Sequence, residues 1–592
     1  MIPRPHSRYL LIEGEASFTT LHLPDPAIHS GGAVLLCPPF GWEEVCAYRA
    51  LREWALELAA AGHPTLRISY PSTGDSTGNV DDPDRLGAWT AAVSAAARDL
   101  RTTVGVARVT ALGIGLGGLL AHLAAAGGAP IDDLVLWGAP ARGRSIVRQL
   151  RAFARLEASI FFEDLPVPEL LSEGELEAGG FRLSAETVTS LAGVDLTAMP
   201  LPAAADRRVL LLQRDGIAAD TDLVEAMEGV GAAVTTAPGS GYLAMTSHPQ
   251  TTEAPREVFA TVRRWLGAVA LPAPPLGGPA SRTAGVITIT DKVLTAAGTV
   301  RETPIVIPHR GQTLSAVLVT PETETRAELA VVLLNAGAVR RIGPNRMWVE
   351  AARRWARRGV PVLRLDVAGI GDSDGDASGY ARDAGLYVPG LVSQVIAALD
   401  ALELSGVAAR FVVGGLCAGA FWAFHAALQD DRVVSAVMIN PRALVWNEDL
   451  GAARDLRALV NQPFSLARLR RAATPERRRA VARWLLGMPG RLRDHVTDRG
   501  RTGRDGDADL DAAIDRFVRS GKRALLLFGD HEPLEAELNR SGRMDRLRGA
   551  DTLALEQIAV RDHTLRPAWA QARAHEALDR SLERELGAVL SA

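Results

Sequence analysis

The chain has 592 residues, of which 47% are hydrophobic and 23% charged, and its formal net charge is −4. The length is about four times that of a typical ~150-residue domain and the composition is globular, so we expect two large domains. The small net charge gives no reason to expect nucleic-acid binding. No stretch of about 18 apolar residues and no apolar leader is evident, so we expect no membrane span and no export.

Cysteine and lysine usage narrows the chemistry further. Cys37, Cys46 and Cys417 are the three cysteines, and Lys292 and Lys522 are the two lysines. An odd number of cysteines without metal-ligand spacing indicates neither a disulfide framework nor a zinc site, and so few lysines disfavour Schiff-base chemistry. We therefore expect a protein of the reducing cytoplasm that holds no metal and no bound cofactor.

The first half of the chain, 1–270, alternates short apolar runs with helical stretches. This pattern predicts a mostly parallel sheet with helices on both faces. The predicted strands are 33–36, 65–68, 109–112, 134–137 and 209–212.

A glycine-rich turn follows the third of these strands. Residues 112–118 read Leu-Gly-Ile-Gly-Leu-Gly-Gly and open an Ala/Leu-rich helix. A strand–turn–helix elbow of this kind displays a catalytic nucleophile. Its central position is Gly115, which has no side chain that could attack a substrate.

Other positions of the first half also lack the expected chemistry. Tyr242 stands where a histidine before a final helix is expected, and Asp215 is a candidate relic of an acid. Pro38 and Pro39 follow the first strand but have no N–H group to offer an oxyanion. We expect this half to be a non-catalytic domain.

The segment 271–283 predicts a linker. Residues 271–279 read Leu-Pro-Ala-Pro-Pro-Leu-Gly-Gly-Pro. Proline removes backbone donors and fixes φ, so this segment cannot continue a helix or a central strand.

An internal repeat relates the two halves. Residues 62–78 match 359–375 without a gap, at an offset of 297, and the two elbows are offset by 302. The match includes a Gly-Asp-Ser-x-Gly turn with Asp75 in one copy and Asp372 in the other. Because one copy lacks a nucleophile, we expect these aspartates to stabilise their turns rather than to serve catalysis.

The second half, 284–592, repeats the α/β pattern of the first. Its predicted strands are 330–334, 360–365, 411–413, 434–439 and 524–528, and its predicted helices include 347–358 and about 567–585.

A helical cap is expected at about 447–520. Between Leu450 and His495 there are eleven arginines and three acidic residues. Such a basic surface suits an acidic carrier protein or the phosphate of pantetheine, but it also fits a solvated helix face.

The second elbow, 414–420, reads Gly-Gly-Leu-Cys-Ala-Gly-Ala and carries Cys417 at its centre. The flanking glycines allow the tight turn, and the N–H of Ala418 begins the next helix, where the dipole favours a thiolate and an oxyanion. A second N–H is expected from Gly337 or Ala338, in the loop after the strand 330–334.

A cysteine nucleophile needs a base and an orienting acid. His563 precedes the last helix, the position expected for the base. After the strand 524–528 the chain reads Gly-Asp-His-Glu-Pro, which makes Glu532 the preferred acid, with Asp530 left open as its competitor.

These motifs together resemble those of the α/β-hydrolase superfamily. They are Gly-Leu-Cys-Ala-Gly at Cys417, Asp-His-Thr at His563 and the paired Gly-Asp-Ser-x-Gly turns. The resemblance implies two tandem α/β-hydrolase domains with helical caps. Within the superfamily the chain is similar to cysteine-elbow acyl shuttles of natural-product pathways, namely aminoacyl transferases of nonribosomal peptide assembly and pyrrolyl-carboxyl transferases, and to exosortase-associated hydrolases.

The resemblance implies an acyltransferase. It would take an acyl group from an acyl or peptidyl carrier protein, on a phosphopantetheine arm, through a Cys417 thioester to the hydroxyl, amine or thiol of a small-molecule acceptor. A Cys–His–acid thioesterase or ester or lactone hydrolase, and a non-enzymatic scaffold, stay open as alternatives.

Overall fold

A computed structural model of the chain describes residues 4–161, 171–269, 271–272, 287–289, 300–322, 326–446 and 502–590. The predicted linker, apart from its first two residues, lies outside these ranges. So does the arginine-rich part of the predicted cap, whereas its last part forms a helix, α16 (Thr502–Arg519).

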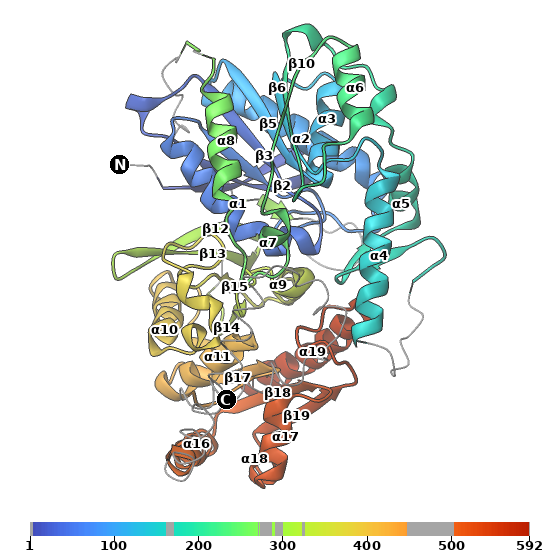
Figure 1. The fold of residues 1–592 in the computed structure, drawn as a ribbon. Helices are drawn as coiled ribbons and strands as arrows, with labels where there is room; N and C mark the ends of the chain where they lie inside the picture. The colour runs from blue at the N-terminus through green and yellow to red at the C-terminus, as the bar shows by residue number, and fades with distance from the viewer. Residues whose placement is uncertain are drawn as a thin grey trace.

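The first half forms an eight-stranded sheet with the order β1-β2-β4-β3-β5-β6-β9-β10 (Figure 1). All five strands predicted in this half are present. An antiparallel pair at one edge, β1 with β2, and a parallel strand at the other, β10, were not predicted. The strands are β1 (His6–Ile12), β2 (Glu15–His22), β3 (Gly32–Cys37), β4 (Thr65–Ile68), β5 (Arg108–Ile114), β6 (Asp133–Trp137), β9 (Arg208–Leu212) and β10 (Ala233–Ala237).

The second half repeats this topology with one further edge strand, in the order β11-β12-β13-β15-β14-β16-β17-β18-β19. Its five predicted strands are also confirmed. Each half is therefore an α/β domain built on a mostly parallel sheet, and the two stand in tandem. The strands are β11 (Ile287–Ile289), β12 (Val300–His309), β13 (Gln312–Pro321), β14 (Leu329–Ala336), β15 (Val362–Leu365), β16 (Arg410–Leu416), β17 (Val433–Ile439), β18 (Arg523–Gly529) and β19 (Leu553–Ile558).

Helices cover both faces of each sheet because the central strands are buried on both sides. In the first half α1 and α8 pack on one face and α2 and α3 on the other; in the second half α9 and α19 oppose α10 and α11. The helices are α1 (Trp42–Ala60), α2 (Arg85–Asp99), α3 (Leu116–Ala126), α4 (Arg144–Phe161), α5 (Ala185–Ala192), α6 (Thr221–Gly229), α7 (Tyr242–Thr246), α8 (Arg256–Leu266), α9 (Met347–Arg357), α10 (Pro389–Leu404), α11 (Ala418–Gln429), α17 (Pro533–Arg540), α18 (Arg543–Arg548) and α19 (Ala568–Leu590).

One helical stretch among the described residues, 384–404, is apolar and long enough to cross a membrane by length and composition alone. It contains α10, whose Leu391, Val395 and Leu399 are buried in the hydrophobic core. In this fold the stretch is a core helix of the second half.

The two halves meet through ion pairs that the repeat itself supplies. Arg67 and Asp75 of the first half correspond in sequence to Arg364 and Asp372 of the second. Arg67 pairs with Asp372, and Arg364 pairs with Asp75. Arg341 lies between the two carboxylates, 3.0 Å from Asp75 and 3.1 Å from Asp372. Reciprocal contacts of this kind define a two-fold interface, so the halves form a pseudo-dimer within one chain.

The prediction that these two aspartates stabilise their own turns is wrong. The adjacent serines do so: Ser76 Oγ donates to the carbonyl of Ser69 at 2.8 Å, and Ser373 Oγ to that of Asp366 at 2.6 Å. The serine hydroxyls make the hydrogen bonds within each turn. The aspartate carboxylates instead pair with arginines of the other half.

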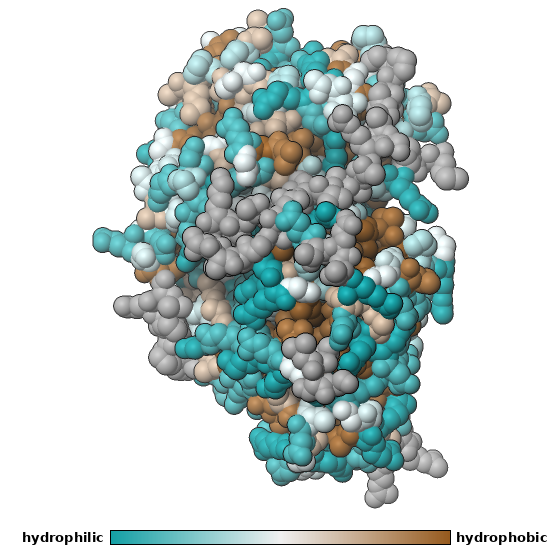
Figure 2. All heavy atoms as spheres, turned by 180° about the vertical axis from the view of Figure 1, so that it is seen from behind, coloured by the Kyte–Doolittle hydropathy of each residue, from teal (hydrophilic) through white to brown (hydrophobic). Residues whose placement is uncertain are grey.

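The interface is buried and continuous with the core. A single hydrophobic cluster contains Tyr9, Phe18 and Val45 of the first half together with many residues of the second. Burial acts to raise the pKa of Asp75, but Arg341 and Arg364 outweigh it and lower that pKa. By contrast, the outer face shown in Figure 2 is mostly hydrophilic, with hydrophobic residues in separate patches.

Candidate active site

The second elbow holds Cys417 in the conformation expected of a displayed nucleophile. Cys417 has φ 59° and ψ −115°, between β16 and α11, and its N–H donates to the carbonyl of Ile439 at 2.9 Å. The helix passes so close to β14 that a Cβ on Gly419 would lie 2.2 Å from the Asn335 carbonyl oxygen. Only glycine fits there, as the motif requires.

His563 and Glu532 come together as a hydrogen-bonded pair. The His563 Nδ1 atom lies 2.9 Å from Glu532 Oε1 and 3.0 Å from Oε2. Asp530 is the competing acid, and its N–H donates to the Val560 carbonyl. Among the described residues, no hydrogen bond joins a side-chain atom of Asp530 to His563. Of the two predicted acids, the structure therefore brings Glu532 to the histidine.

The ring of His563 also interacts with the Cys417 thiol. Burial acts to lower the pKa of His563, but the Cys417 thiolate and Glu532 raise it above its ordinary value. Burial likewise acts to raise the pKa of Cys417, yet the charges of His563 and Arg442 lower that pKa. The pair therefore favours thiolate and imidazolium, the reactive form of a cysteine nucleophile.

The contact between thiol and imidazole is loose. The His563 Nε2 atom is buried and has no partner at hydrogen-bond distance within the described ranges. Catalytic contacts are often long without substrate and tighten when it binds. Because Nδ1 is taken by Glu532, Nε2 is the nitrogen left to face the sulfur.

Asn440 fixes the histidine loop from the sheet side. Its Nδ2 donates to the His563 carbonyl at 2.7 Å, and its Oδ1 accepts from the Gly529 N–H at 2.7 Å. The sequence analysis did not assign a role to Asn440, although its position directly after β17 could have indicated one.

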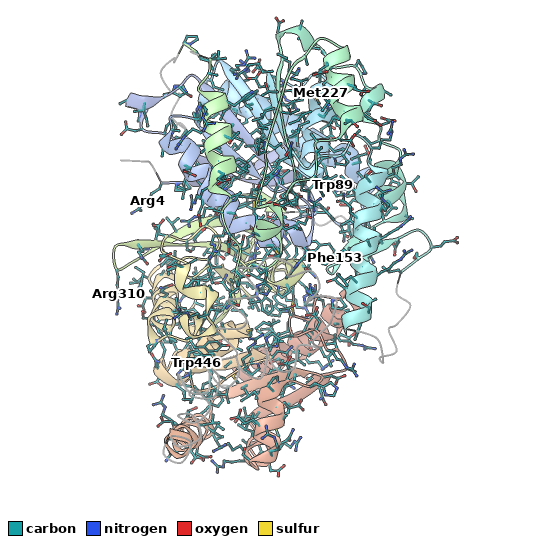
Figure 3. The ribbon with its side chains drawn as sticks, in the orientation of Figure 1. Arg4, Trp89, Phe153, Met227, Arg310 and Trp446 are labelled. Atoms are coloured by element: carbon teal, nitrogen blue, oxygen red, sulfur yellow. The ribbon has the colours of Figure 1, made fainter. Side chains whose placement is uncertain are left out.

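Tyr387 is a second residue that the sequence did not single out. Its hydroxyl lies 3.9 Å from the Cys417 sulfur. The ring stacks on Trp446, with centroids 4.3 Å apart, and packs edge-on against Phe421 (Trp446 is labelled in Figure 3). These aromatic contacts place the hydroxyl beside the nucleophile.

The predicted oxyanion donors lie on the loops expected of them. Ala418 is the first residue of α11, where N–H groups have no acceptor inside the helix. Ala336 and Leu416 are paired in register on β14 and β16, so Gly337 and Cys417 leave neighbouring strands side by side. Gly337 has φ 56°, and a bond from Asn335 Nδ2 to the Val339 carbonyl at 3.0 Å closes the loop that contains Ala338.

The first elbow has the same backbone conformation as the second but different side chains around it. Gly115 has φ 54° and ψ −119°. A Cβ at this position would lie 2.9 Å from the Tyr242 hydroxyl, which donates to Glu43 at 2.8 Å. Tyr242 therefore occupies the space that a nucleophile side chain would need.

Asp215 serves α7 rather than a catalytic base. Its Oδ1 accepts from the N–H groups of Gly241 and Tyr242, and its Oδ2 accepts from Leu243 at 2.9 Å. A carboxylate at a helix N-terminus is stabilising, which accounts for an aspartate here without any catalytic role.

Comparison with known proteins gives structural likenesses only. No protein-family model and no curated protein sequence matches the chain. Est1E from Butyrivibrio proteoclasticus is similar at 17% identity and a TM-score of 0.31, over 44% of this chain and 97% of that one. An α/β serine hydrolase without a lid from Xanthomonas campestris is 15% identical, with a TM-score of 0.29, over 45% and 97%. A dienelactone hydrolase from Anabaena variabilis is 14% identical, with a TM-score of 0.30, over 48% and 96%.

Proposed function

We propose that the second half is a cysteine-dependent acyltransferase. It would take an acyl group from the phosphopantetheine thioester of an acyl or peptidyl carrier protein and pass it to the hydroxyl, amine or thiol of a small-molecule acceptor. The observation that carries the proposal is the Cys417–His563–Glu532 arrangement at a nucleophile elbow. We place the protein in the cytoplasm, where its thiols stay reduced.

The first step forms the acyl-enzyme. The Cys417 thiolate attacks the thioester carbonyl carbon, and N–H groups of Ala418 and of Gly337 or Ala338 stabilise the oxyanion. The tetrahedral intermediate collapses with cleavage of the carbon–sulfur bond to pantetheine. The departing thiolate takes the proton from His563, so the carrier protein leaves as a free thiol.

The second step transfers the acyl group. Neutral His563 removes the proton from the acceptor, which attacks the Cys417 thioester, and collapse restores the thiolate and imidazolium. Exchange of one thioester for another is close to isoenergetic, so the intermediate stays reactive. A serine would instead form a more stable ester, which is why a cysteine at this elbow favours transfer.

Intact-mass spectrometry tests the proposal. The full chain is incubated with carrier proteins loaded with acetyl and aminoacyl groups. We expect a mass increase equal to the acyl group, absent from Cys417→Ala and kept in Cys46→Ala. Cys46 is the matched control because burial raises its pKa and leaves it a neutral thiol.

The result also separates the alternatives. An adduct that persists in Cys417→Ala, or no adduct with any donor, contradicts the proposal. Rapid loss of the acyl group to water without an acceptor would identify a thioesterase or hydrolase. An unreactive Cys417 would favour the scaffold.

A further inference from the structure

The first half contacts the segment that carries His563. Glu157, on α4, pairs with Arg566 at 3.0 Å. Glu177, on β7 (Leu176–Ala178), accepts a hydrogen bond at 3.0 Å from the N–H of Ala568, the first residue of α19. Figure 1 shows α4 running from the first half toward α19. The segment between these two anchors and β19 contains the proposed base.

Arg566 passes this restraint to the histidine loop. Its Nε donates to Asp562 Oδ2 at 2.7 Å. The other oxygen of Asp562 accepts from the Thr564 N–H at 2.9 Å and its hydroxyl at 2.8 Å. His563 therefore lies between residues whose side chains are linked to one another, Asp562, Thr564 and Arg566. Glu157 in turn pairs with Arg566.

The loop needs such support because its backbone is strained. Leu565 has φ 53°, a conformation that non-glycine residues adopt only when their surroundings enforce it. On the sheet side, Asn440 and Glu532 hold the carbonyl and ring of His563. On the opposite side, Glu157 of the first half pairs with Arg566, and Asn345 of the second half donates to the Arg566 carbonyl at 2.8 Å.

The contact between the halves at this point is sheltered from water. The side chains of Glu157 and Arg566 are 14% and 10% exposed. The Arg566 guanidinium lies 4.6 Å from the ring centre of Trp42, at the start of α1. An ion pair and a cation–π contact are both stronger where water is excluded.

We infer that the first half acts as a positioning domain for the active site. Glu157 and Glu177 hold the His563 loop so that the imidazole stays next to Cys417. The inference rests on the proposed role of His563 as the base. It assigns to the first half a function that does not need a nucleophile of its own. Glu157 and Glu177 are positioning residues, since neither touches the reacting atoms.

The test measures the rate at which iodoacetamide alkylates Cys417 as a function of pH, in the full chain. Glu157→Gln removes the charge that holds Arg566, and Glu177→Ala removes the acceptor for Ala568. We expect each to slow alkylation at pH 6.5 about 3- to 10-fold and the double variant more, with the midpoint of the pH profile shifted upward. Glu173→Gln, an exposed acid on the same segment, is the matched control and should match the wild-type profile.

The outcomes distinguish this inference from the proposed function. If wild-type Cys417 reacts no faster than a free thiol at pH 6.5, the proposed function fails. If the wild type is reactive but both variants keep its pH profile, the positioning inference fails. Thermal unfolding identifies any variant that does not fold. In that case Trp42→Leu, which removes the cation–π contact but keeps an apolar side chain against the core, is measured the same way and should shift the profile upward to a smaller degree.

Discussion

The two elbows have one backbone and two chemistries. Gly115 and Cys417 differ by only a few degrees in φ and ψ, and each N–H donates at 2.9 Å to the last residue of the next strand, Trp137 or Ile439. The shape of the turn therefore comes from the sheet and the neighbouring glycines, not from the central residue. What separates the elbows is the central residue, Gly115 in one and Cys417 in the other, and the side chain above it, Tyr242 or His563.

The comparison teaches that the backbone geometry of such an elbow does not depend on a reactive side chain at its centre. In the first half a buried tyrosine and Glu43 fill the place of nucleophile and base. The same half contributes Asp75 and Arg67 to the interface and Glu157 to the histidine loop. Fold and function are carried by different residues, and mutation can separate them.

The largest expected effect comes from breaking the pseudo-two-fold interface. Asp75→Asn removes a carboxylate that pairs with both Arg364 and Arg341, which are buried, and breaking a buried pair in this way costs about 3–5 kcal/mol of unfolding free energy. Urea unfolding measures the loss. The matched control is Asp545→Asn, an exposed ion pair expected to cost less than about 1 kcal/mol.

The same residue predicts a pH dependence. The pKa of Asp75 is lowered in the folded protein, so its contribution is present above the unfolded pKa of about 3.9 and is lost as the pH falls through the folded value. The stability difference between wild type and Asp75→Asn should therefore shrink in acid below about pH 4. A difference that grows in acid would contradict the ion-pair assignment.

The next effect tests the active elbow. His563→Ala removes the charge that lowers the Cys417 pKa, and burial then raises it. We expect about 100-fold slower iodoacetamide alkylation at pH 7, because only the thiolate reacts. Glu532→Gln should fall between this variant and wild type. Asp530→Asn is the control, and a loss in that variant equal to the loss in Glu532→Gln would overturn the choice of acid.

A third change tests the silent elbow. Gly115→Ala places a methyl group 2.9 Å from the Tyr242 hydroxyl at φ 54°. Overpacking together with backbone strain should cost about 1–3 kcal/mol of stability. Gly128→Ala also adds a side chain at a positive φ, 82°, but has open space around it, so a larger loss at Gly115 indicates the clash. Equal losses would show that Tyr242 does not fill the site.

The smallest effect concerns the hydroxyl beside the nucleophile. Tyr387→Phe keeps the stacking on Trp446 but removes the contact with the Cys417 sulfur. A weak hydrogen bond of this length is worth less than about 1 kcal/mol, so alkylation at pH 7 should slow about 2- to 5-fold. No change would mean that the hydroxyl does not stabilise the thiolate.

Much of this arrangement follows from local sequence. The ten predicted strands are present because apolar runs of this length have to be buried, and α11 begins where the Gly-rich elbow ends. The strands β1, β2, β12 and β13, which lie toward one edge of each sheet, were missed because they mix polar and apolar side chains and their pairing is non-local. Tyr387 and Asn440 were missed because no local pattern says that a loop residue will fold back onto Cys417 or His563.

By itself, the sequence determined the duplication, the α/β class of both halves and the presence of a thiol in only one elbow. Spacing and residue type are enough for these, since they depend on periodicity and on whether a side chain exists. The tertiary structure alone decided that Glu532 rather than Asp530 meets His563, and that Asp75 and Asp372 cross between the halves. Those outcomes depend on the direction in which each of these side chains points from its turn. That direction is set by packing against residues that are distant in the sequence.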